Sequence, residues 1–403
     1  GPDDPDHLDA IAAAGGGRIR WILCTHTHRD HSPGAAGLKE PTRAEVLALA
    51  ARADVESGRV TSRRGRWRRA PGPFERTQIP PPTQRHWTVL IQGVDLHLAP
   101  VHALLGRFRF VSDARLDDLM ISVAGDGGGV GPHIDAYDVF LLQATGRRRW
   151  RIAPTGYPRR QPALRDDVPL KMMQPFAATA EWVLEPGDML YLPPGYAHEG
   201  IADGPCSTWS IGFRAPSRLE FLRAFLAECA DDPEGPDPRH GDRGTQPTRH
   251  PGALPADMYA TMQRWAREWR PSSAAIDRCI GRYLTEPKSN VWFDAPDGRI
   301  DRDRFRALLA GGAVELDPRT RMIYRGRSVF INGERFAPPA AALLRRLADD
   351  RRLDAEVLRR ALGDGTLDET LVDHLYRWWA AGWLRHHSAG RNAGRTRPAM
   401  VKS

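Results

Sequence analysis

The chain has few cysteines and no long apolar run, and both absences limit what kind of protein it can be. Its 403 residues contain four cysteines, none of them in a Cys-x-x-Cys spacing. This usage excludes a disulfide framework and a cysteine-based zinc knuckle, and it fits a reducing compartment. No apolar run approaches the roughly 20 residues of a membrane helix, and the first residues show no signal-peptide pattern. We therefore expect a cytoplasmic protein without a membrane partner.

Lysine is also scarce, although the chain is basic. Only four of the 58 basic residues are lysine, and the formal net charge is +8. A basic surface suits a ribosomal or nucleic-acid-associated partner. The densest basic patches are residues 63–69 and the tail after Arg385. A solvated face or a disordered tail explains each patch equally well, so composition alone assigns neither of them a partner.

Two short stretches, residues 131–135 and 193–198, carry the clearest chemical signal. His133 and Asp135 are two positions apart, which puts both side chains on the same face of a strand. A third histidine, His198, follows a Pro-Pro-Gly turn. Two histidines and one carboxylate are the facial triad that holds a divalent iron and leaves coordination positions open. One His-x-Asp pair is weak evidence, so the prediction rests on the combination with the glycine-rich approach and the third histidine.

Short apolar runs separated by glycine and proline surround these stretches. Residues 145–146 and 185–188 have the composition of turns. Many short strands with such turns predict a sandwich or a barrel, and a barrel mouth can gather ligands from distant parts of a sequence. The predicted strands are 139–142, 147–152, 182–184, 189–192 and 206–213.

Residues of about 41 to 385 resemble the bacterial ribosomal oxygenases, a branch of the JmjC/cupin-type 2-oxoglutarate oxygenases. The resemblance implies a mainly β plus α fold: a double-stranded β-helix barrel, a helical dimerisation region and a C-terminal winged-helix-like domain. It also implies an enzyme that uses Fe(II), 2-oxoglutarate and dioxygen to hydroxylate an arginine, at its 3-position, of a large-subunit ribosomal protein. The segments that carry the resemblance are 117–122, 127–133, 137–140, 145–150, 185–188 and 210–216.

The same resemblance implies the roles of the metal-site and cofactor residues. His133, Asp135 and His198 would bind the iron, and Arg148 and Ser122 would bind 2-oxoglutarate. A guanidinium pairs with a carboxylate through a planar fork, and an inward-facing arginine without an anion is costly. Strand alternation puts Arg148 on the opposite face from its two arginine neighbours, so we expect those neighbours to lie in solvent.

The substrate arginine would need a carboxylate and hydrogen-bond acceptors close to the iron. Tyr137, Asp118 and Ser210 stand within the matching segments and are predicted to bind the substrate. Tyr137 has the same parity as the first two metal ligands, so it faces the same way if the strand is regular. For Asp118, a position in solvent at the end of a strand remains an alternative.

The region after the barrel predicts helices first and then a mixture of helices and strands. Apolar residues at helical spacing predict helices within 217–228, 258–269 and 274–283, and residues 231–255 predict a long loop. The resemblance implies a homodimer through these helices. No helix has an Arg/Asn/Gln stripe suited to base edges, so we expect no specific DNA partner. The predicted domains are 1–40, 41–216, 217–290, 291–385 and a basic tail at 386–403.

The N-terminal segment resembles a different family. His26, His28, Asp30 and His31 form the hallmark motif of the metallo-β-lactamase fold, which supplies ligands to one or two zinc ions. The resemblance covers only about residues 5–39, the chain starts at Gly1, and the further ligands of such hydrolases would lie in a longer domain. We therefore expect a mostly inert segment, either a remnant of a gene fusion or the result of a mis-joined or truncated gene model, and a real accessory metal site is the third alternative. The segment replaces the family's N-terminal strands and helix, which predicts an exposed sheet edge and weaker folding.

Two alternative functions remain open at this stage. One is a zinc-dependent, metallo-β-lactamase-like hydrolase remnant, which the absent downstream ligands disfavour. The other is a catalytically silent cupin-type module that binds the ribosome, and the intact triad together with Arg148 disfavours it.

Overall fold

A computed structural model describes residues 23–24, 41–63, 65–154, 163–174, 176–231, 237–241, 250–298, 300–338 and 341–388. The predictions for the metallo-β-lactamase-like segment, apart from residues 23–24, and for the tail beyond residue 388 lie outside these residues. The chain forms two compact units. One contains Gly1–Ala215, Lys288–Thr320 and Arg351–Ser403, and the other contains Pro216–Pro287 and Arg321–Asp350.

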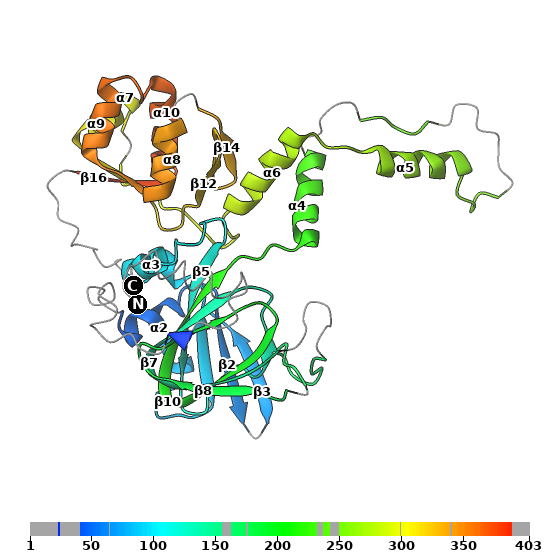
Figure 1. The fold of residues 1–403 in the computed structure, drawn as a ribbon, viewed down its shortest axis with the longest axis vertical. Helices are drawn as coiled ribbons and strands as arrows, with labels where there is room; N and C mark the ends of the chain where they lie inside the picture. Colours follow the sequence, from blue (N-terminus) through cyan, green and yellow to red (C-terminus); the bar gives the residue numbers. More distant parts are fainter. Residues whose placement is uncertain are drawn as a thin grey trace. The chain divides into compact units, whose positions relative to one another are not determined.

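A ten-stranded antiparallel sheet dominates the first unit (Figure 1). Its main path runs β1-β9-β7-β10-β5-β4-β2-β3, with β6 paired to β10 and β8 paired to β7. The strands are β1 (Leu23–Cys24), β2 (Ser57–Arg63), β3 (Arg66–Pro71), β4 (Trp87–Ile91), β5 (Leu116–Ala124), β6 (His133–Ile134), β7 (Val139–Pro154), β8 (Ala180–Leu184), β9 (Met189–Leu192) and β10 (Tyr196–Phe213).

Two long strands make the sheet wrap around itself. The first part of β7, Val139–Leu142, pairs with β9, and its second part, Arg148–Ile152, pairs with β8. In the same way, the start of β10 pairs with β6 and its end pairs with β5. Because each long strand serves two sets of partners, the sheet closes toward the barrel that the sequence predicts. The two residues of β1 pair with β9, so that edge is covered at these positions.

The turn predicted at Thr145-Gly146 is wrong, because these residues lie inside the continuous strand β7. The pairing of β7 with β10 shifts register between Asp203 and Thr208, opposite this point. Gly146 has φ of 62°, the left-handed conformation that a β-bulge often takes from glycine. Gly146 does mark a break in regular strand geometry, but the break is a bulge that bends one strand and not a turn that joins two strands.

The largest core covers the outer face of the sheet. Helices α2 (Arg43–Leu49) and α3 (Ala99–Gly106) contribute Val46, Leu49 and Val101 to it. A capping box between Thr42 and Glu45 starts α2. Alternate residues of the strands fill the rest of this core, among them Trp87, Val89, Ile91, Leu119, Ile121, Trp209 and Ile211. The residues between them in sequence therefore face the inside of the barrel, where a site can form.

Two 3-10 helices, three further helices and a small sheet complete the first unit. Two 3-10 helices, η1 (Arg76–Gln78) and η2 (Val94–Leu96), lie before and after β4. A three-stranded sheet has the order β15-β11-β16. The remaining elements are α7 (Arg302–Gly311), β11 (Gly312–Leu316), β15 (Arg352–Leu353), α9 (Ala355–Gly363), α10 (Glu369–Ala380) and β16 (Leu384–Ser388).

The second unit combines helices with a small sheet. Its helices are α4 (Arg218–Asp231), α5 (Ala256–Glu268), α6 (Ser273–Thr285) and α8 (Ala341–Asp350), and its strands are β12 (Met322–Arg325), β13 (Ser328–Ile331) and β14 (Glu334–Phe336). Gly281 of α6 lies against the Phe330 ring, where an added Cβ would come within 2.3 Å of it. The helices predicted in this region are confirmed, and the described parts of residues 231–255 after α4 contain no helix or strand before α5. The predicted domain boundaries stay predictions.

No helix among the described residues is long and apolar enough to cross a membrane.

Candidate metal centre

Three side chains from two distant stretches meet inside the barrel. His133 lies on β6 and His198 on β10, and the two residues are directly paired across the strands. Asp135 follows β6, and its Oδ2 lies 3.6 Å from His198 Nε2. One ligand atom from each of the three residues lies within 4.8 Å of the other two. Among the described residues this is the one such cluster of potential metal ligands, and it is the predicted triad.

Backbone carbonyls orient both histidine rings in the same way. His133 Nδ1 lies 2.9 Å from the carbonyl oxygen of Gly131, and His198 Nδ1 lies 3.0 Å from that of Tyr196. A carbonyl only accepts, so each Nδ1 carries the proton and donates it. Each Nε2 is then left with its lone pair free, which is the form that binds a metal, and the second hydrogen bond fixes the ring.

The electrostatics of the triad favour a bound cation. Burial, followed by the neighbouring His133, lowers the pKa of His198 to about 3, so this ring stays neutral. Burial raises the pKa of Asp135. A carboxylate that is costly to ionise and a histidine that is costly to protonate both gain when a divalent ion enters between them.

Arg148 points into the barrel close to this triad. Its side chain is 5% exposed, its Nη2 lies 3.5 Å from Cys206 Sγ, and its Nε has no hydrogen-bond partner among the described residues. The guanidinium lies 5.9 Å from the ring of Trp150, and that ring lies 5.9 Å from the ring of His198. A buried guanidinium with no carboxylate partner is costly unless an anion binds there.

The two neighbours of Arg148 lie outside the barrel, as strand alternation predicts. Arg147 pairs with Asp203 at 2.9 Å, and Arg149 pairs with Glu181 at 3.1 Å. Both side chains are about half exposed. Of these three arginines, Arg148 alone has its side chain inside the barrel.

Ser122 lies on the same inner face and takes part in a buried polar cluster. Its hydroxyl donates to the carbonyl oxygen of Thr208 at 3.2 Å. The hydroxyl of Thr208 donates to Oε1 of Gln143 at 2.8 Å, and all three residues are buried. Sequence reasoning selected Ser122 but missed Thr208 and Gln143. The only signal that these two residues give in the sequence is that each is an isolated polar residue in an apolar strand.

Tyr137 lies beside the triad, although the regular strand on which its predicted direction depended ends at Ile134. Its hydroxyl donates to the carboxylate of Asp135. Burial raises the pKa of Tyr137, and the charges of Asp135, Asp118 and Asp117 raise it further. The side chain is still 41% exposed, so it stands at the entrance of the site.

Asp118 and Ser210 share the inner face with Ser122, because their strand neighbours pack into the outer core. Asp118 does not lie free in solvent, which was the alternative that the sequence left open. Lys288 Nζ lies 3.1 Å from Asp118 and 3.2 Å from Asp117. Sequence reasoning missed Lys288, because the lysine stands 170 residues away with no motif around it.

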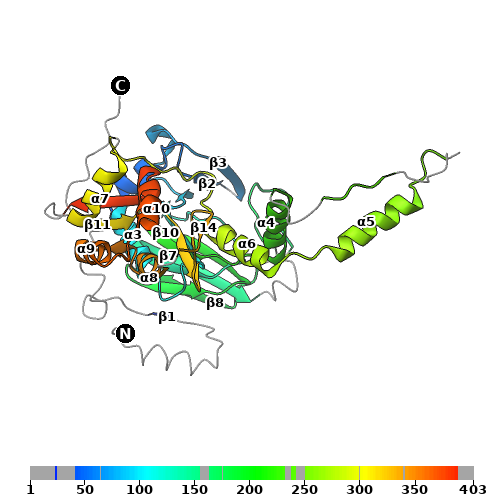
Figure 2. The same ribbon diagram turned by 90° about the horizontal axis from the view of Figure 1, so that it is seen from above.

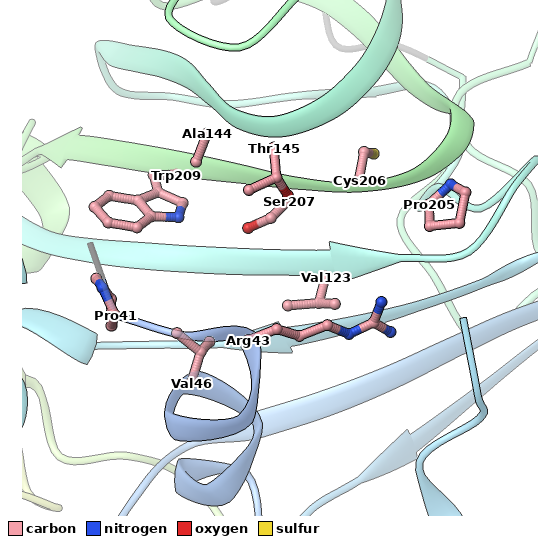
Figure 3. Close-up of a pocket in the computed structure, with 10 residues that line it drawn as sticks. All are labelled: Pro41, Arg43, Val46, Val123, Ala144, Thr145, Pro205, Cys206, Ser207 and Trp209. Atoms are coloured by element: carbon pink, nitrogen blue, oxygen red, sulfur yellow. The ribbon is translucent and has the colours of Figure 1, made fainter. Parts of the chain in front are cut away.

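The structure also has a small pocket between α2 and the sheet, and none of the triad residues lines it. Figure 3 shows α2 on one side of this pocket and strands of the sheet on the other. Cys206 lines it, and the same residue contacts Arg148 inside the barrel. The pocket contains none of the predicted site residues, and its lining is Pro41, Arg43, Val46, Val123, Ala144, Thr145, Pro205, Cys206, Ser207 and Trp209.

Comparisons with known proteins agree with this site. A family model described as "JmjC domain" matches residues 103–221, and one described as "ROXA-like winged helix" matches residues 266–385. The chain is 34% identical over 322 residues to the ribosomal protein uL16 3-hydroxylase of Escherichia coli, and the match covers 79% of this chain and 84% of that protein.

The structural comparison gives the same result. The ribosomal oxygenase YcfD from Escherichia coli, solved in complex with cobalt and 2-oxoglutarate, superposes with a TM-score of 0.71 at 30% identity, covering 86% of this chain and 91% of that one. A hydroxyacylglutathione hydrolase of Anaeromyxobacter dehalogenans is 41% identical over 75 residues, but this covers only 15% of this chain and 29% of the hydrolase.

The predicted resemblance and fold class are thus confirmed over most of the chain. The sequence match, the two family models and the superposition all lead to one conclusion: the chain belongs to the bacterial ribosomal oxygenases, which join a JmjC domain to a ROXA-like winged helix.

Proposed function

We propose that this chain is an Fe(II)- and 2-oxoglutarate-dependent hydroxylase of the large-subunit ribosomal protein uL16, and that it modifies an arginine. The observation that carries the proposal is the triad of ligand atoms within 4.8 Å of one another, close to a buried arginine whose Nε has no partner. Because ribosomes work in the bacterial cytoplasm, we place the protein there.

The three ligands fit a divalent iron. His133 and His198 each offer a neutral Nε2, and Asp135 offers a carboxylate that the cation would hold in its ionised form. This donor set leaves open positions on the metal. When bound, the iron together with 2-oxoglutarate and dioxygen supplies the oxidising power to hydroxylate a carbon.

Arg148 is suited to hold the distal carboxylate of 2-oxoglutarate. Its buried Nε has no hydrogen-bond partner among the described residues, and Ser122 lies on the same inner face. A carboxylate there restores the ion pair that the buried guanidinium lacks. Trp150, which lies between Arg148 and His198, gives the cofactor an apolar wall and keeps water out.

An acidic entrance suits a cationic substrate side chain. Tyr137 and Asp118 lie close enough for the aspartate charge to raise the pKa of the phenol, and Ser210 lies on the same face. We assign these three residues to the substrate arginine. Lys288 already neutralises part of the acidic charge, so an arriving guanidinium must share Asp118 with the lysine ammonium.

The test of the substrate assignment is mass spectrometry on a uL16 peptide. We expect an added mass of about 16 Da on an arginine of the peptide, and no added mass when that arginine is replaced by lysine. Asp118→Asn should raise the KM for the peptide and leave the KM for 2-oxoglutarate unchanged. Asp203→Asn, which removes a carboxylate from the outer surface, is the control. Modification of the lysine peptide at the same rate would contradict the assignment.

We also propose that the second unit forms a homodimer through α4, α5 and α6. These helices expose apolar side chains that a monomer leaves in water, among them Leu219, Leu226, Tyr259 and Met262. Light scattering should give twice the chain mass of 44.9 kDa. Leu226→Asp should shift the protein toward the monomer, and Leu164→Asp, at an exposed leucine outside these helices, should not.

A further inference from the structure

The hairpin formed by β2 and β3 carries three exposed arginines on one face. Arg63 is directly opposite Arg66, and Arg68 is opposite Thr61, so the three guanidinium groups project from the same side of the two strands. All three side chains are exposed. We call Arg63, Arg66 and Arg68 the arginine face. Figure 2 shows β3 at the margin of the sheet, where it is the last strand of the path.

No carboxylate of the described residues pairs with these three guanidinium groups. Residues 57–74 contain no aspartate or glutamate, and none of the three arginines forms an ion pair within the described part of the chain. The contrast with β7 is direct. There, Arg147, Arg149 and Arg151 are each paired with an acidic residue of a neighbouring segment. An arginine-rich composition therefore does not explain the hairpin, because arginines on other strands of the same sheet have partners.

The arrangement costs stability in the isolated protein. Like charges directly opposite each other in an antiparallel pair are destabilising, and Arg63 and Arg66 are such a pair. Charge on an edge strand also protects it from pairing with other chains, but this protection does not require that the charges gather on one face of the hairpin without a carboxylate beside them. Three unbalanced guanidinium groups on one face instead match a partner that carries many negative charges.

We infer that the arginine face binds the phosphate backbone of RNA. This choice of polyanion rests on the proposed function, since the RNA of the large subunit surrounds ribosomal proteins. Guanidinium groups pair with phosphate oxygens through two hydrogen bonds, and such contacts supply the sequence-independent part of nucleic-acid affinity.

The arginine face is suited to contact phosphates and not bases. Trp67, the aromatic residue within the arginine run, is paired with Ser62 and projects from the opposite side of the hairpin. The arginine face therefore offers no ring on which a base could stack. RNAs of different sequence but equal length should bind with similar affinity.

The test is binding of a fluorescein-labelled, single-stranded RNA to the full chain, followed by anisotropy at several salt concentrations. We expect the triple variant R63E/R66E/R68E to bind about tenfold or more weakly in low salt, and its slope of log affinity against log salt to fall by about 2, or roughly 0.7 for each lost phosphate contact. The control is R304E/R325E/R359E, which changes the net charge equally at three exposed arginines elsewhere. It should keep most of the affinity.

Three outcomes would overturn the inference: no RNA binding by the unchanged chain at about 50 mM salt, equal losses in the two triple variants, or better competition by polyglutamate than by unlabelled RNA. Hydroxylation of the free peptide by the hairpin variant is measured alongside. Its preservation shows that the variant is folded, and its absence in every variant would count against the proposed function alone.

Discussion

The position of Arg148 in its strand determines the direction of its side chain. It stands in a run of three arginines, yet only this side chain is 5% exposed and has a nitrogen without a partner. Alternation along β7 separates it from its neighbours, and Trp150 two positions later lies on the same side. The sequence predicted this direction correctly, because it depends only on parity within a strand.

Arg148→Lys should weaken binding of 2-oxoglutarate. Lysine keeps the positive charge but cannot present two parallel donors to a carboxylate. We expect the KM for 2-oxoglutarate to rise about tenfold or more, the equivalent of one lost charge-assisted hydrogen bond. Arg149→Lys, at the exposed neighbour, should leave it unchanged. An unchanged KM in Arg148→Lys would remove this residue from the cofactor site.

His102 predicts how stability depends on pH. Burial, followed by the charge of Arg351, lowers the pKa of this histidine from 6.5 to about 4, and its Nδ1 has no hydrogen-bond partner among the described residues. Below pH 6.5 the unfolded chain binds a proton at this residue that the folded chain does not take up until about pH 4. Acid therefore favours unfolding across that window.

The matching measurement is urea denaturation of the metal-free protein at pH 7 and pH 5. His102→Gln should reduce the loss of unfolding free energy between these two values by about 2 kcal/mol. His198 shifts in the same direction, so the comparison between variant and unchanged chain isolates His102. An identical pH dependence in both would show that folding does not lower the pKa of His102.

Among the elements, β7 has a bulge at Gly146, two residues before Arg148, and this bulge affects the direction in which the Arg148 side chain points. With φ of 62°, Gly146 occupies a conformation that costs other residues about 1–2 kcal/mol. An added Cβ would also come within 2.2 Å of the Pro205 carbonyl oxygen, a backbone atom that cannot move away easily. The register shift of β7 against β10 lies beside this contact.

Gly146→Ala should destabilise the protein by more than the backbone conformation alone costs, and it should raise the KM for 2-oxoglutarate. Gly204→Ala is the matched control, because Gly204 has φ of 80° and no atom within 4 Å of an added Cβ. Only the roughly 1–2 kcal/mol of backbone strain applies there. Equal losses in thermal denaturation would mean that the bulge tolerates a side chain.

The elements also show what the sequence could and could not predict. Apolar runs between glycine and proline predicted β8 and β9, and apolar residues at helical spacing predicted the helices after the barrel, because both signals are local. Glycine at 146 was misread as a turn because a bulge uses the same left-handed conformation. The contacts of Lys288 with Asp117 and Asp118 cross about 170 residues, and no local pattern encodes such a pairing.

At the scale of the whole molecule, two parts of the chain carry metal-binding motifs, and only one lies among the described residues. His133→Ala removes a ligand of the triad and should abolish hydroxylation. His28→Ala changes the N-terminal motif and should leave hydroxylation unchanged, because the oxygenase site is complete without it. Turnover assays on both variants separate the two sites. Loss of activity from His28→Ala alone would show that the N-terminal segment works in the reaction.

Succinate formation from 2-oxoglutarate by the Fe(II)-loaded full chain, measured with and without the uL16 peptide, is the direct test of the proposed hydroxylase activity. We expect the peptide to accelerate succinate formation, and hydroxylated peptide to accumulate in proportion to the succinate. A folded, metal-loaded protein that forms no succinate above background and leaves the peptide unchanged would contradict the proposed activity.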